Sequence, residues 1–241
     1  MAMRHYLRAL GRDDLPAQIA LSGRTYLLRQ TFKHNSVSAV GLYEADGDRV
    51  VLKCYRRAPA VVVPMRWAGR LMAAHEAAVL RRVQDVPGVP RLRGRYGSTG
   101  IVRDYVEGAP LTRDSQVDEE FCSRLMAILE ELHRRGIAYV DLEKAENILI
   151  GEDGRPHLID FQVAFNVPDR YLGATFPMRW VRRHLQGADL YHARKHMRHL
   201  MRARLSRKEM QDLRGRPWIV TASNALTAPY RRLRRLLLRK R

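Results

Sequence analysis

The chain of 241 residues has little cysteine, few aromatic residues and no long hydrophobic run. Its two cysteines, Cys54 and Cys122, lie far apart in the sequence, which argues for a reducing interior and against a disulfide framework or a zinc site. No apolar run approaches the roughly 18–20 residues that a membrane-spanning helix needs. No long apolar stretch follows the charged residues 1–10, so no signal peptide is expected. Aromatic residues make up 7% of the chain and form no RNA-stacking motif.

Acidic residues are scarce relative to basic ones, which gives a net charge of +19. Residues 178–241 hold 19 Lys and Arg against 3 Asp and Glu, a net +16, so the first 177 residues carry only +3. A basic segment of this kind attracts polyanions such as anionic lipid headgroups, phosphorylated glycolipid or nucleic acid. The alternative is a basic face that only contacts solvent.

Hydrophobic residues make up 46% of the chain, enough to bury a core. Alternating apolar residues and turn signals predict short strands over residues 24–30, 39–45, 49–55, 91–96 and 101–106, and a hairpin of residues 147–150 and 157–161.

Two helices are predicted before the basic segment. In residues 70–84, Leu71, Ala74, Ala78 and Val79 lie near one face, and Pro87 and Pro90 end the helix. Residues 118–135 have an apolar stripe (Phe121, Leu125, Ile128, Leu129 and Leu132), an acidic first turn and a glycine after the last turn. The remainder of the chain is expected to be helical and basic.

The β-rich first half and α-rich second half predict an α+β fold of two layers with a cleft between them. The third strand reads VVLKCY, with Lys53 at its centre, and the next helix carries HEAAVL, with Glu76. A lysine that reaches two phosphate groups must be held in place, and a carboxylate on a packed helix can hold it. These two segments resemble the protein-kinase-like family, in which such a lysine contacts ATP and such a glutamate pairs with it.

The stretch GIAYVDLEKAENILIGEDGRPHLIDF, residues 136–161, resembles the catalytic loop and metal-binding motif of that family. The resemblance places Asp141 at the catalytic-base position, Asn147 and Asp160 as Mg²⁺ ligands, and Lys144 as a lysine that steadies the transferred phosphate. Carboxylate and amide oxygens are ligands that Mg²⁺ prefers. Alternatively, Asp141 and Asn147 cap a turn and Asp160 ends a strand.

Several positions depart from the family pattern. Tyr139-Val140-Asp141 replaces His-Arg-Asp, one extra residue separates Asp141 from Asn147, and Gln162 replaces the glycine after Asp160-Phe161. No glycine-rich loop joins the first two strands, and Lys33 lies in that connection as a candidate phosphate contact. Asp104 and Val106, in the expected hinge 104–107, would face adenine through backbone groups. No Ala-Pro-Glu motif follows Asp160.

With these departures, the chain resembles the compact bacterial branch of the family, which includes lipopolysaccharide core (heptose or Kdo) kinases and RIO-like kinases. The resemblance implies a bilobal kinase-like fold with a β-rich N-lobe and a short, mainly helical C-lobe. The expected divisions are an N-terminal extension 1–23, an N-lobe 24–107, a C-lobe 108–227 and a basic amphipathic tail 228–241. The implied activity is transfer of the γ-phosphoryl group of ATP, with Mg²⁺, to a hydroxyl of a lipopolysaccharide core sugar or of protein Ser/Thr. A nucleotide-binding pseudokinase scaffold and a nucleic-acid-binding protein remain as alternatives.

Two motifs lie outside the resemblance. His192, His196 and His199 recur at i, i+4 and i+7, and the Arg and Lys residues around them favour a surface or phosphate-facing row over a metal site. Asp189 is a candidate brace for the catalytic loop. In residues 229–241, leucines at helical spacing among seven Lys and Arg predict a helix in an anionic membrane interface, a helix docked on the body, or a nucleic-acid arm. A cytoplasmic location, peripheral on the inner face of the cell membrane, is therefore expected.

Overall fold

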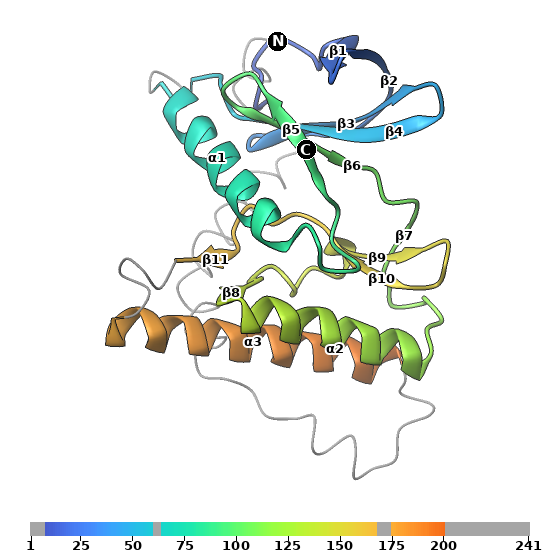
Figure 1. The fold of residues 1–241 in the computed structure, drawn as a ribbon, viewed down its shortest axis with the longest axis vertical. Helices are drawn as coiled ribbons and strands as arrows, with labels where there is room; N and C mark the ends of the chain where they lie inside the picture. The colour runs from blue at the N-terminus through green and yellow to red at the C-terminus, as the bar shows by residue number, and fades with distance from the viewer. Residues whose placement is uncertain (1–7, 60–63, 168–174, 201–241) are drawn as a thin grey trace, which may run out of the picture. The chain divides into compact units, whose positions relative to one another are not determined.

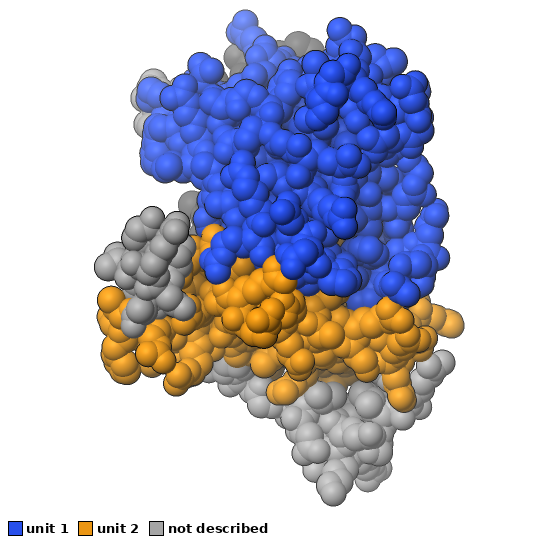
Figure 2. Space-filling view, viewed as in Figure 1, with its two compact units in different colours: residues 1–109, 149–163 blue, residues 110–148, 164–241 orange. Residues whose placement is uncertain are grey.

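The computed structural model describes residues 8–59, 64–167 and 175–200, and the predicted tail helix lies outside these ranges. The chain divides into two compact units (Figure 2): residues 1–109 and 149–163 form unit 1, and residues 110–148 and 164–241 form unit 2. Among the described residues, no helix is both long enough and apolar enough to cross a membrane.

Unit 1 is built on an antiparallel six-stranded sheet in the order β1-β2-β3-β4-β6-β5 (Figure 1). Its strands are β1 Gln18–Leu21, β2 Arg24–His34, β3 Ser38–Ala45, β4 Asp48–Tyr55, β5 Leu92–Tyr96 and β6 Gly100–Asp104. The strands predicted from residue 24 onward are present, and β1 precedes them in the segment expected to be an extension. Leu10, Leu15 and Ile19 from that segment are buried in the core with Tyr26, Tyr43, Leu52 and Val102.

The helix α1, Arg66–Val83, packs on β4, β5 and β6. Its predicted apolar face is wrong at three of four positions, because Leu71 is 62% exposed and both Ala74 and Ala78 are exposed. The buried face instead contains Ala73, Glu76, Ala77, Val79 and Leu80. The helix is rotated relative to the predicted stripe because a charged residue, Glu76, lies on the face that packs on the sheet.

A second, three-stranded sheet has the order β10-β9-β7, with β7 Gly108–Pro110, β9 Ile148–Gly151 and β10 Pro156–Leu158. β9 and β10 form the predicted hairpin. The connection after β10 leads directly to Asp160.

Unit 2 contains α2, Glu119–Arg134, and α3, Phe176–Leu200, which pack against each other (Figure 1). The predicted stripe of α2 is confirmed, since all five of its apolar residues are buried. Asp118 caps the helix by accepting a hydrogen bond from the N–H of Phe121 at 2.7 Å. A two-stranded sheet of β8, Ile137–Ala138, and β11, Phe165–Asn166, flanks the loop that carries Asp141, and the short 3-10 helix η2, Ala145–Asn147, ends that loop.

Candidate active site

In unit 1, the sheet and α1 bring Lys53 and Glu76 into contact. Lys53 lies on the central strand β4, opposite Val40 on β3 and Ile101 on β6. Its Nζ lies 3.0 Å from Oε2 of Glu76, and the two side chains are only 4% and 1% exposed. A buried ion pair of this kind is retained only when further hydrogen bonds satisfy its remaining atoms.

Those further bonds come from Tyr55 and Phe161. The hydroxyl of Tyr55 donates a hydrogen bond to Oε2 of Glu76, and the backbone N–H of Phe161 donates to Oε1 at 3.1 Å. Burial, followed by the charge of Glu76, raises the pKa of Tyr55 far above its usual value, so its hydroxyl stays protonated and remains a donor. Glu76 is therefore fixed by three partners, and Lys53 is fixed through it.

Asp160 joins the same cluster from the segment that follows β10. Its Oδ1 lies 2.6 Å from Nζ of Lys53, and its Oδ2 lies 3.6 Å from Nζ of Lys33, which extends from β2. Asp160 adopts a left-handed backbone conformation with φ of 69°, which is uncommon for a residue other than glycine. Two lysines from two strands thus converge on one carboxylate in a strained segment, an arrangement typical of functional sites.

The connection between β2 and β3 is ordered by a side chain instead of by glycines. Oδ1 of Asn35 accepts hydrogen bonds from the N–H groups of Val37 at 2.9 Å and Ser38 at 3.0 Å. This Asx turn gives the connection a defined shape without a glycine-rich sequence.

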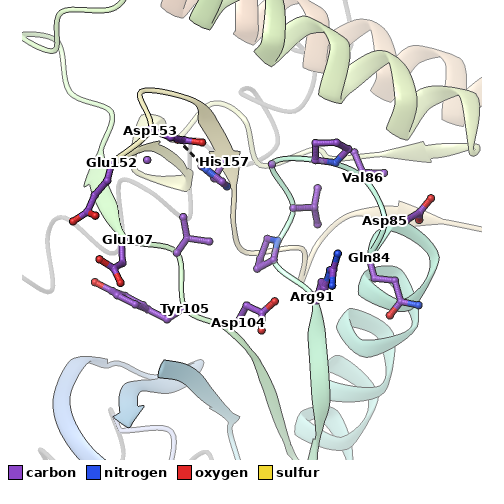
Figure 3. Close-up of a pocket in the computed structure, with 16 residues that line it drawn as sticks. Gln84, Asp85, Val86, Arg91, Asp104, Tyr105, Glu107, Glu152, Asp153 and His157 are labelled. Carbon is purple, nitrogen blue, oxygen red and sulfur yellow. Dashed lines mark ion pairs between the residues drawn. The ribbon is translucent and has the colours of Figure 1, made fainter. Parts of the chain in front are cut away.

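The expected hinge 104–107 begins at the last residue of β6 and lines a cavity of about 550 Å³ on unit 1, together with the loop after α1 and the β9–β10 turn (Figure 3). The N–H of Asp104 donates to the carbonyl of Arg91 at 2.9 Å, and the carbonyl of Glu107 accepts from the N–H of Glu152 at 3.3 Å. Within the described part of the chain, the backbone of Val106 forms no hydrogen bond. Val106 thus has backbone groups available for a ligand.

One aromatic pair near this segment was missed by sequence reasoning. Phe32 on β2 is 44% exposed and stacks on Tyr105, with ring centroids 6.2 Å apart and planes 14° apart. The signal was a large aromatic residue beside Lys33 on a strand, but its partner lies 73 residues later in the chain. An exposed aromatic face is suited to a planar ring system.

In unit 2, the loop of residues 141–147 brings Asp141, Lys144 and Asn147 together. Nζ of Lys144 lies 2.7 Å from Oδ2 of Asp141, and Nδ2 of Asn147 donates to the same oxygen at 3.0 Å and to the backbone carbonyl of Asp141 at 3.1 Å. Because the amide nitrogen of Asn147 is used inside the loop, its amide oxygen remains as an acceptor or metal ligand.

Asp189 on α3 supports this loop from beneath. Its side chain is fully buried and accepts hydrogen bonds at 2.7 Å from the N–H groups of Tyr139 and Val140, and its Oδ2 lies 3.0 Å from Nε2 of His133. Val140 has φ of 72°, a clear outlier for a β-branched residue. Asp189 therefore holds the strained residue that immediately precedes Asp141.

The histidine row of α3 divides into different environments. His192 is buried, so it is not a surface residue, while His199 is exposed and Nε2 of His196 donates to the carbonyl of Leu142 at 2.8 Å. The described residues contain no group of three or more His, Cys, Asp or Glu side chains arranged to hold a metal ion.

Comparison with solved structures identifies the fold. The crystal structure of the BubR1 kinase domain aligns with a TM-score of 0.55 at 17% sequence identity, covering 78% of this chain and 65% of that one. The chain has a protein-kinase-like fold. The α+β class and the kinase-like fold predicted from the sequence are confirmed.

Sequence comparisons support the kinase-like superfamily more locally. Serine/threonine-protein kinase OXI1 of Arabidopsis thaliana is 32% identical over 108 residues, 39% of this chain and 25% of that protein. Serine/threonine-protein kinase C of a Synechocystis species is 33% identical over 102 residues, 36% of this chain and 19% of that protein. The matches thus span a quarter or less of these relatives, and no family model matches the chain.

Proposed function

We propose that the chain is a phosphotransferase that moves the γ-phosphoryl group of ATP to a hydroxyl group. The observation that carries this proposal is the buried cluster of Lys53, Glu76 and Asp160 within a kinase-like fold. Burying a lysine with two carboxylates costs desolvation free energy, and such clusters of buried charges are typical of functional sites. Binding of phosphate groups by Lys53 would account for this cluster.

Each candidate site residue of unit 1 has a role in this proposal. Lys53 presents a compact positive charge to phosphate oxygens, and Glu76 keeps its ammonium group in place. Lys33 adds a second positive charge from β2, so it lies on a paired strand and not in the connection where the sequence placed it. Val106 offers its backbone N–H and C=O to adenine, and the neighbouring ring of Tyr105 flanks the hinge.

In unit 2, Asp141 orients the acceptor hydroxyl and accepts its proton, a role that requires a carboxylate within hydrogen-bond reach of the acceptor on a rigid loop. Its side chain is 15% exposed and is held by Lys144 and Asn147. Lys144 places its positive charge near the phosphoryl group that is transferred, where it would stabilise the negative charge of that group.

Mg²⁺ fits the residues that are present. Asp160 provides a carboxylate and Asn147 an amide oxygen, and both are hard oxygen donors of the kind that this ion selects. Mg²⁺ would neutralise charge on the phosphates when bound.

The proposed acceptor is a hydroxyl on a lipopolysaccharide core sugar or on protein Ser/Thr. The names of the two sequence relatives favour protein Ser/Thr, and the net charge of +16 over residues 178–241 favours a glycolipid. These possibilities are separated by experiment below.

The test is transfer of radiolabelled phosphate from ATP with Mg²⁺ to a cell-envelope glycolipid fraction and, separately, to casein. The wild-type chain should label one of the two acceptors. Asp160→Asn should abolish labelling, whereas Asp114→Asn, an equivalent change at an exposed loop position, should not. ATP binding without labelling of either acceptor or of the chain itself would contradict the proposal and favour a nucleotide-binding scaffold.

We also propose that the basic end holds the enzyme at an anionic membrane surface on its cytoplasmic side. Each Lys or Arg near such a surface contributes about 1 kcal/mol at physiological salt. Deleting residues 229–241 should release the chain from vesicles that contain phosphatidylserine and leave it unbound to neutral vesicles. Equal binding of the full-length and the truncated chain to anionic vesicles would refute this role. Tight, salt-sensitive RNA binding that is lost on truncation would instead favour a nucleic-acid arm.

A further inference from the structure

Unit 2 contains a pocket of about 210 Å³ beside the loop that carries Asp141. The loop contributes Glu143 and Ala145, and the last turns of α3 contribute Lys195, His196 and His199. Arg113, from the segment before α2, completes the basic lining. Because one water occupies about 30 Å³ of liquid, the volume suits a ligand of roughly seven waters, the size of a phosphate or carboxylate with part of a sugar ring.

The pocket is tied to the catalytic loop through His196. Nε2 of His196 lies 2.8 Å from the carbonyl oxygen of Leu142, the residue that follows Asp141. A carbonyl oxygen only accepts hydrogen bonds, so Nε2 carries the hydrogen and protonation occurs at Nδ1. A ligand in the pocket therefore lies against the segment that positions Asp141.

The lining is strongly biased toward positive charge. Arg113 and Lys195 contribute basic side chains, His196 and His199 contribute imidazole rings, and Glu143 is the single carboxylate in the lining. Within the described ranges, neither Arg113 nor Lys195 forms an ion pair. By contrast, most other basic side chains on the loop and on α2 are paired, as Lys144 is with Asp141.

The like charges in the pocket act on one another. Burial lowers the pKa of His196, the Leu142 carbonyl opposes this shift, Lys195 and His199 lower the pKa further, and Glu143 raises it. An anion in the pocket would relieve this repulsion and favour the protonated ring. A cation is disfavoured for the same reason.

We propose that this pocket is the acceptor subsite and that it binds a phosphate or carboxylate group carried by the acceptor beside the hydroxyl that is phosphorylated. The inference rests on the proposed function and narrows its acceptor to an anionic, sugar-sized molecule. The pocket and Asp141 lie in the same unit, and the loop that carries Asp141 also lines the pocket. Binding of the anionic group would therefore fix the position of the acceptor relative to the proposed base, Asp141.

The test compares glucose 6-phosphate with glucose as probes, using calorimetric titration of the full chain without ATP. Lys195→Gln removes one charge from the pocket, and Arg194→Gln removes one charge from the neighbouring exposed position of the same helix. This pair controls for nonspecific attraction to the basic end, which both variants retain.

Glucose 6-phosphate should bind more tightly than glucose, and Lys195→Gln should weaken its binding about fivefold, the effect of one close charge pair near a surface. Arg194→Gln should change it less than twofold. Equal binding of the two probes, or equal effects of the two variants, would overturn the inference.

Binding and transfer separate this inference from the proposed function. Anion binding lost in Lys195→Gln, without phosphoryl transfer to any acceptor by the wild-type chain, would refute the enzymatic proposal and with it the acceptor role of the pocket. Transfer to a neutral sugar, unaffected by Lys195→Gln, would overturn the subsite alone.

Discussion

Replacing Asp189 by asparagine removes one of the two acceptor oxygens that hold the catalytic loop in its strained conformation. The carboxylate accepts hydrogen bonds at 2.7 Å from two backbone N–H groups, of Tyr139 and Val140, through separate oxygens. Asparagine supplies only one oxygen, and its NH₂ group would face the second N–H. One buried donor therefore loses its acceptor, which costs about 1–3 kcal/mol.

In a chain of this length, a loss of 1 kcal/mol lowers the melting temperature by about 2–4 °C, so the expected decrease is about 2–12 °C. The left-handed Val140 adds strain of about 1–3 kcal/mol that the wild-type contacts must hold. Releasing that strain would displace Asp141, so phosphoryl transfer should fall more steeply than stability. The measurements are thermal unfolding by circular dichroism and the transfer rate at a temperature where the variant is folded.

The matched control is Asp114→Asn, which makes the same chemical change at an exposed position in unit 2. If Asp189→Asn melts together with Asp114→Asn and transfers phosphate at the wild-type rate, the reasoning about the loop is refuted.

Three further predictions concern packing and charge. Glu76→Ala would leave the hydroxyl of Tyr55 and the N–H of Phe161 without their buried acceptor, while Lys53 keeps Asp160 as a partner. The free energy of unfolding in urea titrations should fall by about 1–3 kcal/mol for each buried donor, and a smaller loss than for exposed Glu152→Ala would contradict this. Gly69→Ala should destabilise the chain by about 1–3 kcal/mol, because a Cβ at this position would lie 2.0 Å from the carbonyl oxygen of Arg56. Gly187→Ala, in the interior of α3 where a Cβ would meet no other atom, should stabilise the chain slightly. Equal effects of the two substitutions on the free energy of unfolding would refute the packing of α1. Burial lowers the pKa of His192, so the unfolded chain takes up a proton at a higher pH than the folded chain does. Stability should therefore fall as the pH drops from 6.5 through the lowered pKa. His192→Leu should flatten this part of a plot of melting temperature against pH, and an unchanged plot would contradict the prediction.

Local patterns in the sequence predicted most of the sheet and α2 because strand and helix periods are encoded in neighbouring residues. The resemblance of VVLKCY and HEAAVL to the kinase-like family identified Lys53 and Glu76, and the structure brings them into contact across 23 positions of sequence. The face of α1 was predicted wrongly because hydrophobicity alone decided it. Burial of Glu76 depends on Lys53 and Tyr55, and no local count of apolar residues contains that information.

Contacts between distant parts of the chain could not be predicted with the same detail. Asp189 lies 50 positions from Tyr139, so its two hydrogen bonds depend on how α3 packs beneath the loop. The strained backbone of Val140 follows from that packing and has no signal in the residue itself. The basic pocket likewise combines Arg113 with Lys195, which are separated by α2 and the catalytic loop.

The central claim is that Asp141 serves phosphoryl transfer, and single-turnover transfer by Asp141→Asn tests it most directly. The variant and the wild-type chain are each mixed with radiolabelled ATP, Mg²⁺ and the acceptor found in the screen, and ATP affinity is measured separately. We expect Asp141→Asn to bind ATP with similar affinity and to transfer phosphate at a rate lower by about 10²-fold or more, the usual contribution of a positioned base. A folded variant that binds ATP and transfers phosphate at the wild-type rate would contradict the account.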